Sequence, residues 1–498
     1  MDKSCFMGID FGTQSVRCGV VDCAGALIAI GDERYNTFHP KPGYAEQDPA
    51  ETLSAMERAL IKCRAKAGDN VFRRIAGIAV CATSSTVLAV DGNGSPLMNA
   101  ILWMDNRASA HAEAIGRTAH ENLRHCGGEE SAEWLVPKMM WIRDNMPDVY
   151  EESSRIVELQ DYVNHYLTGS WSASICQATC KANYVEERGG FDEDFFRTIG
   201  FPEFFGKADI EVLNLGAPVG ELRASLAAKF GIPRGTLVYQ GGVDAHVCGI
   251  GLGVCRPGDT GVVMGSSFVQ LALTESARFH DGIWGPYKSA VVPGLYCLEG
   301  GQVSAASITE WFVREFNVDG ENPYSVMAAE AGAIPSGSEG LVMLDFFQGN
   351  RTPYKNASAR GVFFGLTLAH TRAHMYRAVM EGVAYGMRNI LEAMESGGDA
   401  INQLSGCGGV TRNRVWLQII SDVVNKPTVL TKNSGDAGVL GCAVIAAVGS
   451  GYFPDFGRAC DNMVRMTEVI TPDRERHAQY EESYGRYLDL YENLKDLY

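Results

Sequence analysis

Two tight polar turns, each between two apolar runs, carry residue types that bind phosphate. The first follows Asp10 near the start of the chain, and the second lies past its middle. Their residues are Gly12, Thr13 and Gln14 in the first copy and Gly265, Ser266 and Ser267 in the second. Glycine lets the backbone approach phosphate oxygens, and turn N–H groups and hydroxyls donate to them. One copy is typical of an ordinary hairpin, but two copies half a chain apart predict two related domains that grip the phosphates of ATP from both sides.

Asp10 lies at the base of the first turn, where its carboxylate would repel a phosphate. We therefore predict that Asp10 holds Mg²⁺ through water. The pattern is not a Walker loop, which needs GxxxxGK[ST] before a helix, and it is not a dinucleotide fingerprint. A second apolar run follows Ser15, which predicts another strand instead of a helix.

Two further segments extend the predicted site. Residues 404–418 run from an apolar stretch through Gly408 and Gly409 into a helical pattern, and such a turn at a helix N-terminus can hold the ribose and α-phosphate of a nucleotide. The apolar segment 237–244 predicts a strand that ends on the carboxylate of Asp244, before the second hairpin.

The hydrophobic patterns along the chain predict alternating α and β elements. Strands are expected at 5–10, 16–22, 26–31, 75–82 and 85–90. Helices are expected at 49–66, 106–117, 133–145, 160–167 and 371–395. The last is the clearest, because Met375, Val379, Val383 and Ile390 fall on one face at helical spacing. We interpret it as a core helix.

The length and the net charge of the chain limit its expected number of domains and its expected partners. The chain of 498 residues exceeds what one hydrophobic core usually supports, so two domains are expected, residues 1–248 and 249–498. A formal net charge of −17 argues against nucleic acid or an anionic membrane as a partner. No apolar run reaches membrane-spanning length and no signal-peptide pattern precedes the first strand, so a cytoplasmic location is expected. A homodimer is a further expectation.

The 14 cysteines mostly lie inside apolar segments. Cys176 and Cys180, together with Cys248 and Cys255, raise the question of zinc, but their spacing fits no common finger or ribbon. We interpret them as reduced structural thiols. His246, two residues after Asp244, is given no role.

Two signature stretches make the chain resemble the FGGY carbohydrate kinase family, part of the sugar kinase, Hsp70 and actin superfamily. Gly361–Leu366, His374–Met375 and Ala378–Glu381 fit the C-terminal signature of that family position by position. Lys138–Ile142 fits part of the N-terminal signature, although Leu135 stands where proline, serine or threonine is usual. The resemblance implies an α/β fold of two ribonuclease H-like domains around a central cleft.

The resemblance also implies roles residue by residue. It places Asp10, Gly12 and Thr13 in a first phosphate loop, Gly265, Ser266 and Ser267 in a second, and Gly408, Gly409 and Asn413 in the adenosine motif. Asp244 falls on the catalytic base. A sugar hydroxyl is a poor nucleophile until its proton can leave, so a carboxylate within hydrogen-bond reach orients it and accepts that proton. Positioning and charge neutralisation supply most of the remaining acceleration of phosphoryl transfer.

Within the family the chain most resembles the ribulokinase branch. The resemblance assigns sugar binding to Lys181, Glu299 and Ser84, and it places Trp103 near the sugar pocket. The loop 347–353 resembles the "GNR-P" loop of that branch. A lysine can donate to a ketose carbonyl or hydroxyl, and a glutamate can accept from hydroxyls. The implied reaction is ATP-dependent phosphorylation of the terminal hydroxyl of a ketopentose such as ribulose, with Mg²⁺.

Two alternatives stay open at this point. Residues 102–107 resemble a motif shared by xylulose, ribulose and polyol kinases, so a xylulokinase or an erythritol-type polyol kinase is the second interpretation. A non-catalytic nucleotide switch on the same clamp is the third. Asp244 separates the last from the others, because a switch needs no base opposite a sugar pocket.

Overall fold

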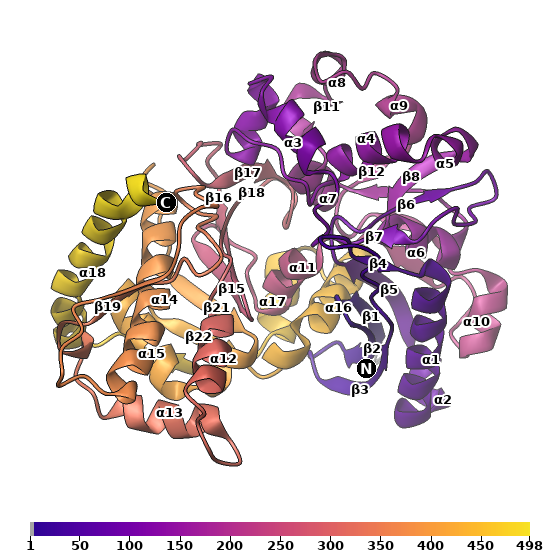
Figure 1. Cartoon of the computed structure of the whole chain (residues 1–498). Helices are drawn as coiled ribbons and strands as arrows, with labels where there is room; N and C mark the ends of the chain where they lie inside the picture. Colours follow the sequence, from indigo (N-terminus) through magenta and orange to yellow (C-terminus); the bar gives the residue numbers. More distant parts are fainter. Residues whose placement is uncertain (1–3) are drawn as a thin grey trace.

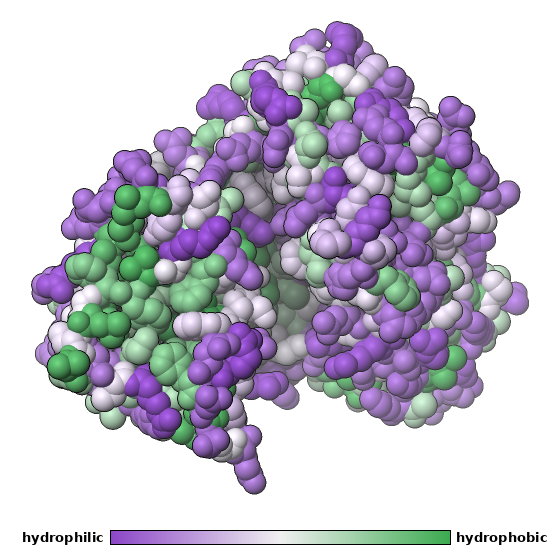
Figure 2. Space-filling model, viewed as in Figure 1, coloured by the Kyte–Doolittle hydropathy of each residue, from purple (hydrophilic) through white to green (hydrophobic). Residues whose placement is uncertain are grey.

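Two large sheets form the cores of two lobes in the computed structural model, which describes residues 4–498 (Figure 1). Met1–Lys3, the first residues of the predicted N-terminal domain, lie outside the described residues. One sheet is built from strands before residue 240 and the other from strands after residue 258. Figure 2 shows a hollow between the two lobes. The α/β architecture with a central cleft is thus present.

The N-terminal sheet has six strands in the order β13-β14-β5-β1-β2-β3. Its strands are β1 (Cys5–Phe11), β2 (Ser15–Asp22), β3 (Leu27–Arg34), β5 (Ile75–Ala82), β13 (Pro218–Glu221) and β14 (Leu237–Tyr239). The first three form an antiparallel meander, and β5 runs parallel to β1. Almost every residue of β1 and β5 is buried, as expected for central strands covered on both faces.

A helix from the far end of the chain covers one face of this sheet. α1 (Pro49–Ala67) packs on β2 and β3, whereas α16 (Ala437–Gly449) packs on β1 and β5. The residues of α16 from Ala437 to Ala447 are all buried, and the helix is apolar on every side. α16 also packs against α11 (Asp244–Gly251), so the two halves of the chain are joined at the base of the hollow.

A smaller subdomain sits on the N-terminal lobe, at the top of Figure 1. Its sheet consists of β4 (Glu46–Gln47), β7 (Ala100–Ile101), β6 (Val87–Val90) and β8 (Arg155–Glu158). Its main helices are α3 (Ser109–Gly116), α4 (Leu135–Asn145), α5 (Pro147–Glu152), α7 (Ile175–Lys181), α8 (Glu193–Thr198) and α9 (Phe204–Lys207), whereas α6 (Leu159–Thr168) packs on β5 of the six-stranded sheet. Apolar residues of α4 and α8 share a core with β6.

The C-terminal sheet has seven strands in the order β17-β18-β16-β15-β21-β22-β23. They are β15 (Asp259–Met264), β16 (Phe268–Thr274), β17 (Trp284–Lys288), β18 (Tyr296–Gln302), β21 (Gln403–Cys407), β22 (Thr428–Thr431) and β23 (Met466–Ile470). The helices of this lobe are α12 (Ala306–Glu315), α13 (Pro323–Gly332), α14 (Arg372–Glu395), α15 (Arg414–Val424), α17 (Phe456–Met463) and α18 (Arg474–Leu494). The hairpin β19 (Val342–Leu344) and β20 (Val362–Phe364) packs beside α14.

The predicted elements are found at or near their expected positions. The strands expected at 5–10, 16–22, 26–31 and 75–82 are β1, β2, β3 and β5, and the expected helix 371–395 is α14. The strand expected at 85–90 starts two residues later, as β6. α14 is a core helix, as predicted, because most of its residues are buried.

One prediction about Asp244 is wrong. The strand expected over 237–244 ends at Tyr239, and Asp244 is the first residue of α11. Beyond Tyr239 the segment stays against β5: a side chain at Gly241 would meet the carbonyl oxygen of Val80 at 2.0 Å, and Val243 forms an isolated bridge to Ala82. Glycine permits this close approach of backbone, and α11 begins at the next residue, Asp244.

Two further predictions concern the whole chain. The boundary predicted between residues 248 and 249 falls within α11, and it stays a prediction. Within residues 4–498, none of the helices combines the length and the apolar character that crossing a membrane requires.

Candidate active site

Both predicted phosphate turns are present, one in each of the two large sheets, and each joins two neighbouring antiparallel strands. The first joins β1 to β2, with the Gly12 N–H donating to the Ser15 carbonyl at 3.0 Å. The second joins β15 to β16, with the Gly265 N–H donating to the Ser267 carbonyl at 3.1 Å. Gln14 and Ser266, at the tips of the turns, are exposed. Each turn therefore offers backbone and side-chain donors to a ligand.

The first turn is held by three side chains from neighbouring segments. Gln47 Nε2 donates to the Thr13 carbonyl at 2.7 Å, and the Tyr35 hydroxyl donates to the Gly12 carbonyl. Trp103 Nε1 donates to Thr13 Oγ1 at 3.1 Å. Trp103, which the resemblance placed near the sugar, thus contacts the phosphate turn directly. It connects the two halves of the predicted site.

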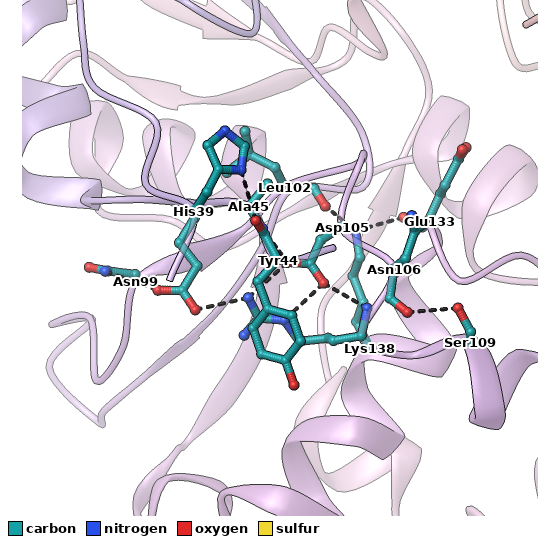
Figure 3. A network of polar contacts seen from close by, with 12 residues as sticks. His39, Tyr44, Ala45, Asn99, Leu102, Asp105, Asn106, Ser109, Glu133 and Lys138 are labelled. Carbon is teal, nitrogen blue, oxygen red and sulfur yellow. Dashed lines mark hydrogen bonds and ion pairs between the residues drawn. The ribbon is translucent and has the colours of Figure 1, made fainter. Parts of the chain in front are cut away.

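A buried polar network fixes the loop that carries Trp103 (Figure 3). Asp105 is fully buried and accepts from the Ala45 N–H at 2.6 Å and from Arg107 Nη2 at 2.7 Å. The ammonium of Lys138, also fully buried, has three backbone partners. These are the carbonyl groups of Ser85, Leu102 and Glu133, at 2.7, 2.7 and 2.8 Å. Because every donor of the ammonium is used, Lys138 has a structural role in this subdomain.

Asp10 and Asp244 are close enough for each charge to affect the other. Burial, followed by the negative charge of Asp10, raises the pKa of Asp244 to about 6. Burial likewise raises the pKa of Asp10, against a hydrogen bond from the Cys81 thiol to Asp10 Oδ1 at 3.3 Å. A side chain at Gly438, in the first turn of α16, would meet Asp10 Oδ2 at 2.6 Å. The carboxylate of Asp10 supplies oxygen donors of the kind that a hard divalent cation prefers.

Asp244 also faces the predicted sugar side. Its Oδ1 accepts from the Ala245 N–H at 2.8 Å, and the positive charges of His246 and Lys181 lower its pKa against the effect of burial. The carboxylate is therefore within electrostatic range both of Asp10, beside the first phosphate turn, and of Lys181.

Lys181 and Glu299 form an ion pair between the two lobes. Lys181 ends α7 in the upper subdomain, whereas Glu299 lies in β18 of the C-terminal sheet. Their Nζ and Oε1 atoms are 3.5 Å apart, and the side chains are only 8% and 9% exposed. Burial opposes the charge on Lys181, but Glu299, Cys180 and Glu133 together hold the lysine pKa above its usual value. Burial also opposes ionisation of Glu299, yet Lys181, His246 and Arg351 keep its pKa low.

Aromatic side chains that the sequence did not single out surround this pair. The Lys181 ammonium lies 5.4 Å from the ring centroid of Trp134 and 5.0 Å from that of Trp284. Arg351 of the predicted "GNR-P" loop lies over Trp284 and pairs with Glu133 at 3.1 Å. Both tryptophans and Arg351 line a cavity of about 300 Å³. Ring faces stabilise a buried cation, and Trp134 was detectable only as the residue before the signature helix.

Ser84 is half-buried and contacts a different partner. Its hydroxyl donates to Glu158 Oε1 at 3.1 Å, and the Thr86 N–H donates to the second oxygen of the same carboxylate at 3.1 Å. Glu158 thus fixes the turn after β5. The sugar contact expected of Ser84 stays a prediction.

The predicted adenosine motif packs against the second phosphate turn. Gly408 has φ +100°, and a side chain there would meet the Met264 carbonyl at 2.4 Å, so the position requires glycine. A side chain at Gly409 would meet nothing within 4 Å, which leaves open space above the turn. Asn413 caps α15, because its Oδ1 accepts from the Trp416 N–H at 3.1 Å.

Comparison with known proteins decides the family. A model described as the FGGY family of carbohydrate kinases, N-terminal domain, matches residues 5–251, and the C-terminal domain of the same family matches residues 261–450. The chain belongs to the FGGY family of carbohydrate kinases. This confirms the predicted resemblance, the two-domain fold of the actin and Hsp70 superfamily, and an enzyme that phosphorylates carbohydrates.

This FGGY kinase matches individual relatives over almost its whole length. It is 30% identical over 538 residues to an FGGY carbohydrate kinase domain-containing protein of Danio rerio, covering 99% of this chain and 98% of that protein. It is 28% identical to a ribulokinase of Geobacillus thermodenitrificans, covering 99% and 95% of the two chains. The solved structure of a xylulose kinase from Rhodospirillum rubrum has a TM-score of 0.89 at 27% identity, covering 99% of both chains.

Proposed function

We propose that this FGGY kinase transfers the γ-phosphoryl group of ATP to the terminal hydroxyl of a 2-ketopentose, with Asp244 as general base. The observation that carries the proposal is the position of Asp244, whose pKa responds both to Asp10 and to Lys181. A carboxylate between these two charges can accept a proton from a sugar hydroxyl that faces the phosphate. A non-catalytic nucleotide switch has no use for such a group.

Both lobes contribute residues to the proposed binding of Mg-ATP. The turns at Gly12–Gln14 and Gly265–Ser267 donate to the phosphates, and the Gly408–Gly409 turn leaves space for the nucleoside. Asp10, as an oxygen donor facing a second carboxylate, fits Mg²⁺ held through water. When bound, the ion supplies charge neutralisation on the phosphates. The chain itself orients the hydroxyl at Asp244 and receives its proton there.

The sugar is proposed to bind beside the Lys181–Glu299 ion pair. Glu299 Oε2 is buried without a hydrogen-bond partner, so it can accept from a sugar hydroxyl. Lys181 can donate to a carbonyl or hydroxyl of the ketose. Relatives described as ribulokinase and as xylulose kinase match at the same 28% identity, so ribulose and xylulose are the first candidates, with erythritol-type polyols after them.

A substrate panel tests this assignment. With Mg-ATP and a coupled ADP assay, kcat/KM should be highest for a ketopentose, and we expect ribulose to exceed xylulose, erythritol and glycerol. The physical reason is that a polyol lacks the carbonyl that Lys181 can bind, and an unpaired buried donor lowers affinity. Product analysis by NMR should show phosphate on the terminal carbon. A wide preference for glycerol or erythritol would overturn the ketopentose assignment.

The pKa of Asp244 predicts how activity depends on pH. A base must be ionised, so kcat/KM should fall as the pH drops through about 6, by about tenfold for each unit below it. Lys181→Met removes a positive charge that lowers this pKa and should shift the break upward, whereas Lys181→Arg should leave it in place. The profiles are measured with saturating Mg-ATP. A wild-type profile that stays flat to pH 5 contradicts Asp244 as the base.

A homodimer and a cytoplasmic location also remain predictions. Apolar side chains are exposed on β20 and in the segment after it, where Phe364 and Leu366 are 51% and 53% exposed and Leu368 is fully exposed. Exposed apolar groups of this kind are typical of interaction surfaces, and they support the homodimer.

A further inference from the structure

Two thiols and an imidazole meet in the wall of the proposed sugar pocket. Cys176 and Cys180 lie one turn apart on α7, and His246 lies on α11, two residues after Asp244. One potential ligand atom from each residue lies within 4.8 Å of the other two, and all three side chains are buried. We propose that this cluster binds a soft divalent cation such as Zn²⁺, with Glu299 as the fourth ligand.

The spacing of the cluster suits tetrahedral coordination. Cys180 Sγ lies 3.5 Å from His246 Nε2. Zinc bonds of about 2.3 Å to sulfur and about 2.0 Å to nitrogen place two tetrahedral ligand atoms roughly 3.5 Å apart. The i, i+4 spacing puts both thiols on one face of α7, toward α11. The three atoms of the two thiols and the imidazole can therefore close around one ion.

Glu299 is the remaining donor in this proposal, and its side chain has to turn toward the thiols, because its oxygens are not among the atoms that lie within 4.8 Å of one another. Its Oε2 lies 3.8 Å from His246 Nε2 and has no hydrogen-bond partner, although it is buried. The second ring nitrogen, His246 Nδ1, is also buried without a partner. Buried polar atoms are normally satisfied, so two such atoms beside the thiols are a second indication of a ligand.

The charges of the surrounding groups also balance with an ion present. Metal binding requires both thiols to lose their protons to solvent. Two thiolates and the Glu299 carboxylate then face Zn²⁺ and the Lys181 ammonium, and the formal charges cancel.

Zinc binding should interfere with sugar binding, because Glu299 cannot serve both ligands. This consequence rests on the proposed function, in which Glu299 binds the sugar. The metal site itself does not. Zinc would then act as an inhibitor that competes with the sugar and leaves the phosphate turns untouched.

Cobalt titration tests the metal site directly. Added Co²⁺ should bind wild-type protein at one ion per chain, giving thiolate-to-metal charge-transfer absorption and the strong visible bands of a tetrahedral ion, and Zn²⁺ should abolish both. Cys176→Ser and Cys180→Ser should lose the charge-transfer band and weaken Zn²⁺ binding by roughly 100-fold or more. Cys460→Ser, another buried thiol, is the matched control and should leave both unchanged. Absence of the band in wild type, or its persistence in both cluster variants, overturns the proposal.

Two further measurements guard against failure of the variants to fold. Zn²⁺ should raise the melting temperature of the wild type in proportion to its binding, and an unchanged melting temperature with excess Zn²⁺ counts against the site. Calorimetric sugar binding without nucleotide should weaken as Zn²⁺ is added. If no ketopentose binds, the proposed function fails, while the cobalt spectrum still decides the metal site.

Discussion

Replacing Asp244 with asparagine is expected to lower kcat by roughly 10²–10⁴, the usual contribution of general-base catalysis. Asparagine keeps the shape of the side chain, and its oxygen can still accept from the Ala245 N–H, which is 2.8 Å from Asp244 Oδ1. The amide cannot accept the proton of the sugar hydroxyl, however. Steady-state turnover with saturating sugar and Mg-ATP measures the effect.

The same variant should remain folded and should bind ATP. Burial and Asp10 raise the pKa of Asp244 to about 6, so ionisation of this group at higher pH destabilises the fold, and the neutral amide relieves that repulsion. At pH 8 the melting temperature should therefore equal or exceed that of the wild type. The difference should shrink as the pH falls below about 6 and vanish below about 4, where the carboxyl is protonated in the folded and the unfolded chain alike.

Asp10→Asn is the matched comparison, because it makes the same change at the neighbouring carboxylate. It should raise the Mg²⁺ concentration needed for half-maximal activity, whereas Asp244→Asn should leave that concentration nearly unchanged. Wild-type turnover in Asp244→Asn would remove Asp244 from the catalytic role. An equal Mg²⁺ requirement in both variants would remove the distinction between base and metal-holding carboxylate.

The elements of the fold were largely predictable because their signals are local. The hairpins around Gly12 and Gly265 show as two apolar runs with a polar turn, and the α14 helix shows as a sustained apolar face. The strand before Asp244 was predicted too long, because β14 ends at Tyr239 and only an isolated bridge from Val243 to Ala82 follows it. The residue types of the segment do not show where the regular pairing stops.

Contacts between distant segments could not be predicted in the same way. α16 is apolar on all sides, which indicates a buried helix, but nothing in its sequence says that it covers a sheet formed by the start of the chain. The thiols of Cys176 and Cys180 were compared with those of Cys248 and Cys255 by spacing alone. The fold instead brings them to His246, which comes from another helix.

The predicted site residues fall into the same two groups: those with a local signal in the sequence and those that depend on contacts between distant segments. The turn residues follow from residue type, and the structure places them in turns between strands. Trp103 was predicted for the sugar, yet its indole contacts Thr13 of the phosphate turn. Trp134 and Trp284 were missed, because an isolated tryptophan before a helix or in a strand is ordinarily a core residue. Only their position around the Lys181 ammonium distinguishes them.

Lys181→Ala and Glu299→Ala are each expected to reduce kcat/KM for the best sugar by about one to two decades. Each charge-assisted hydrogen bond to the sugar is worth roughly 1.5–3 kcal/mol. Removing one partner also leaves the other charge buried and unpaired, which is costly for a pair only 8% and 9% exposed. The loss should therefore exceed that of an exposed ion pair, and the melting temperature should fall as well.

Milder substitutions separate sugar binding from stability. Lys181→Met and Glu299→Gln keep most of the side-chain volume, and the double variant removes both charges together. If the pair acts only in holding the lobes, the double variant should regain the stability that each single variant loses. If the pair binds sugar, kcat/KM should stay low in the double variant although stability returns.

Basal ATP hydrolysis without sugar provides the last comparison. Lys181 and Glu299 belong to neither the phosphate turns nor the Gly408–Gly409 turn, so hydrolysis and nucleotide affinity should barely change in all of these variants. A parallel loss of ATP binding would indicate general damage to the cleft. If both alanine variants phosphorylate ribulose as well as the wild type, the sugar contacts lie elsewhere in the pocket. Membership of the carbohydrate kinase family would stand in either case, because it rests on matches over both domains.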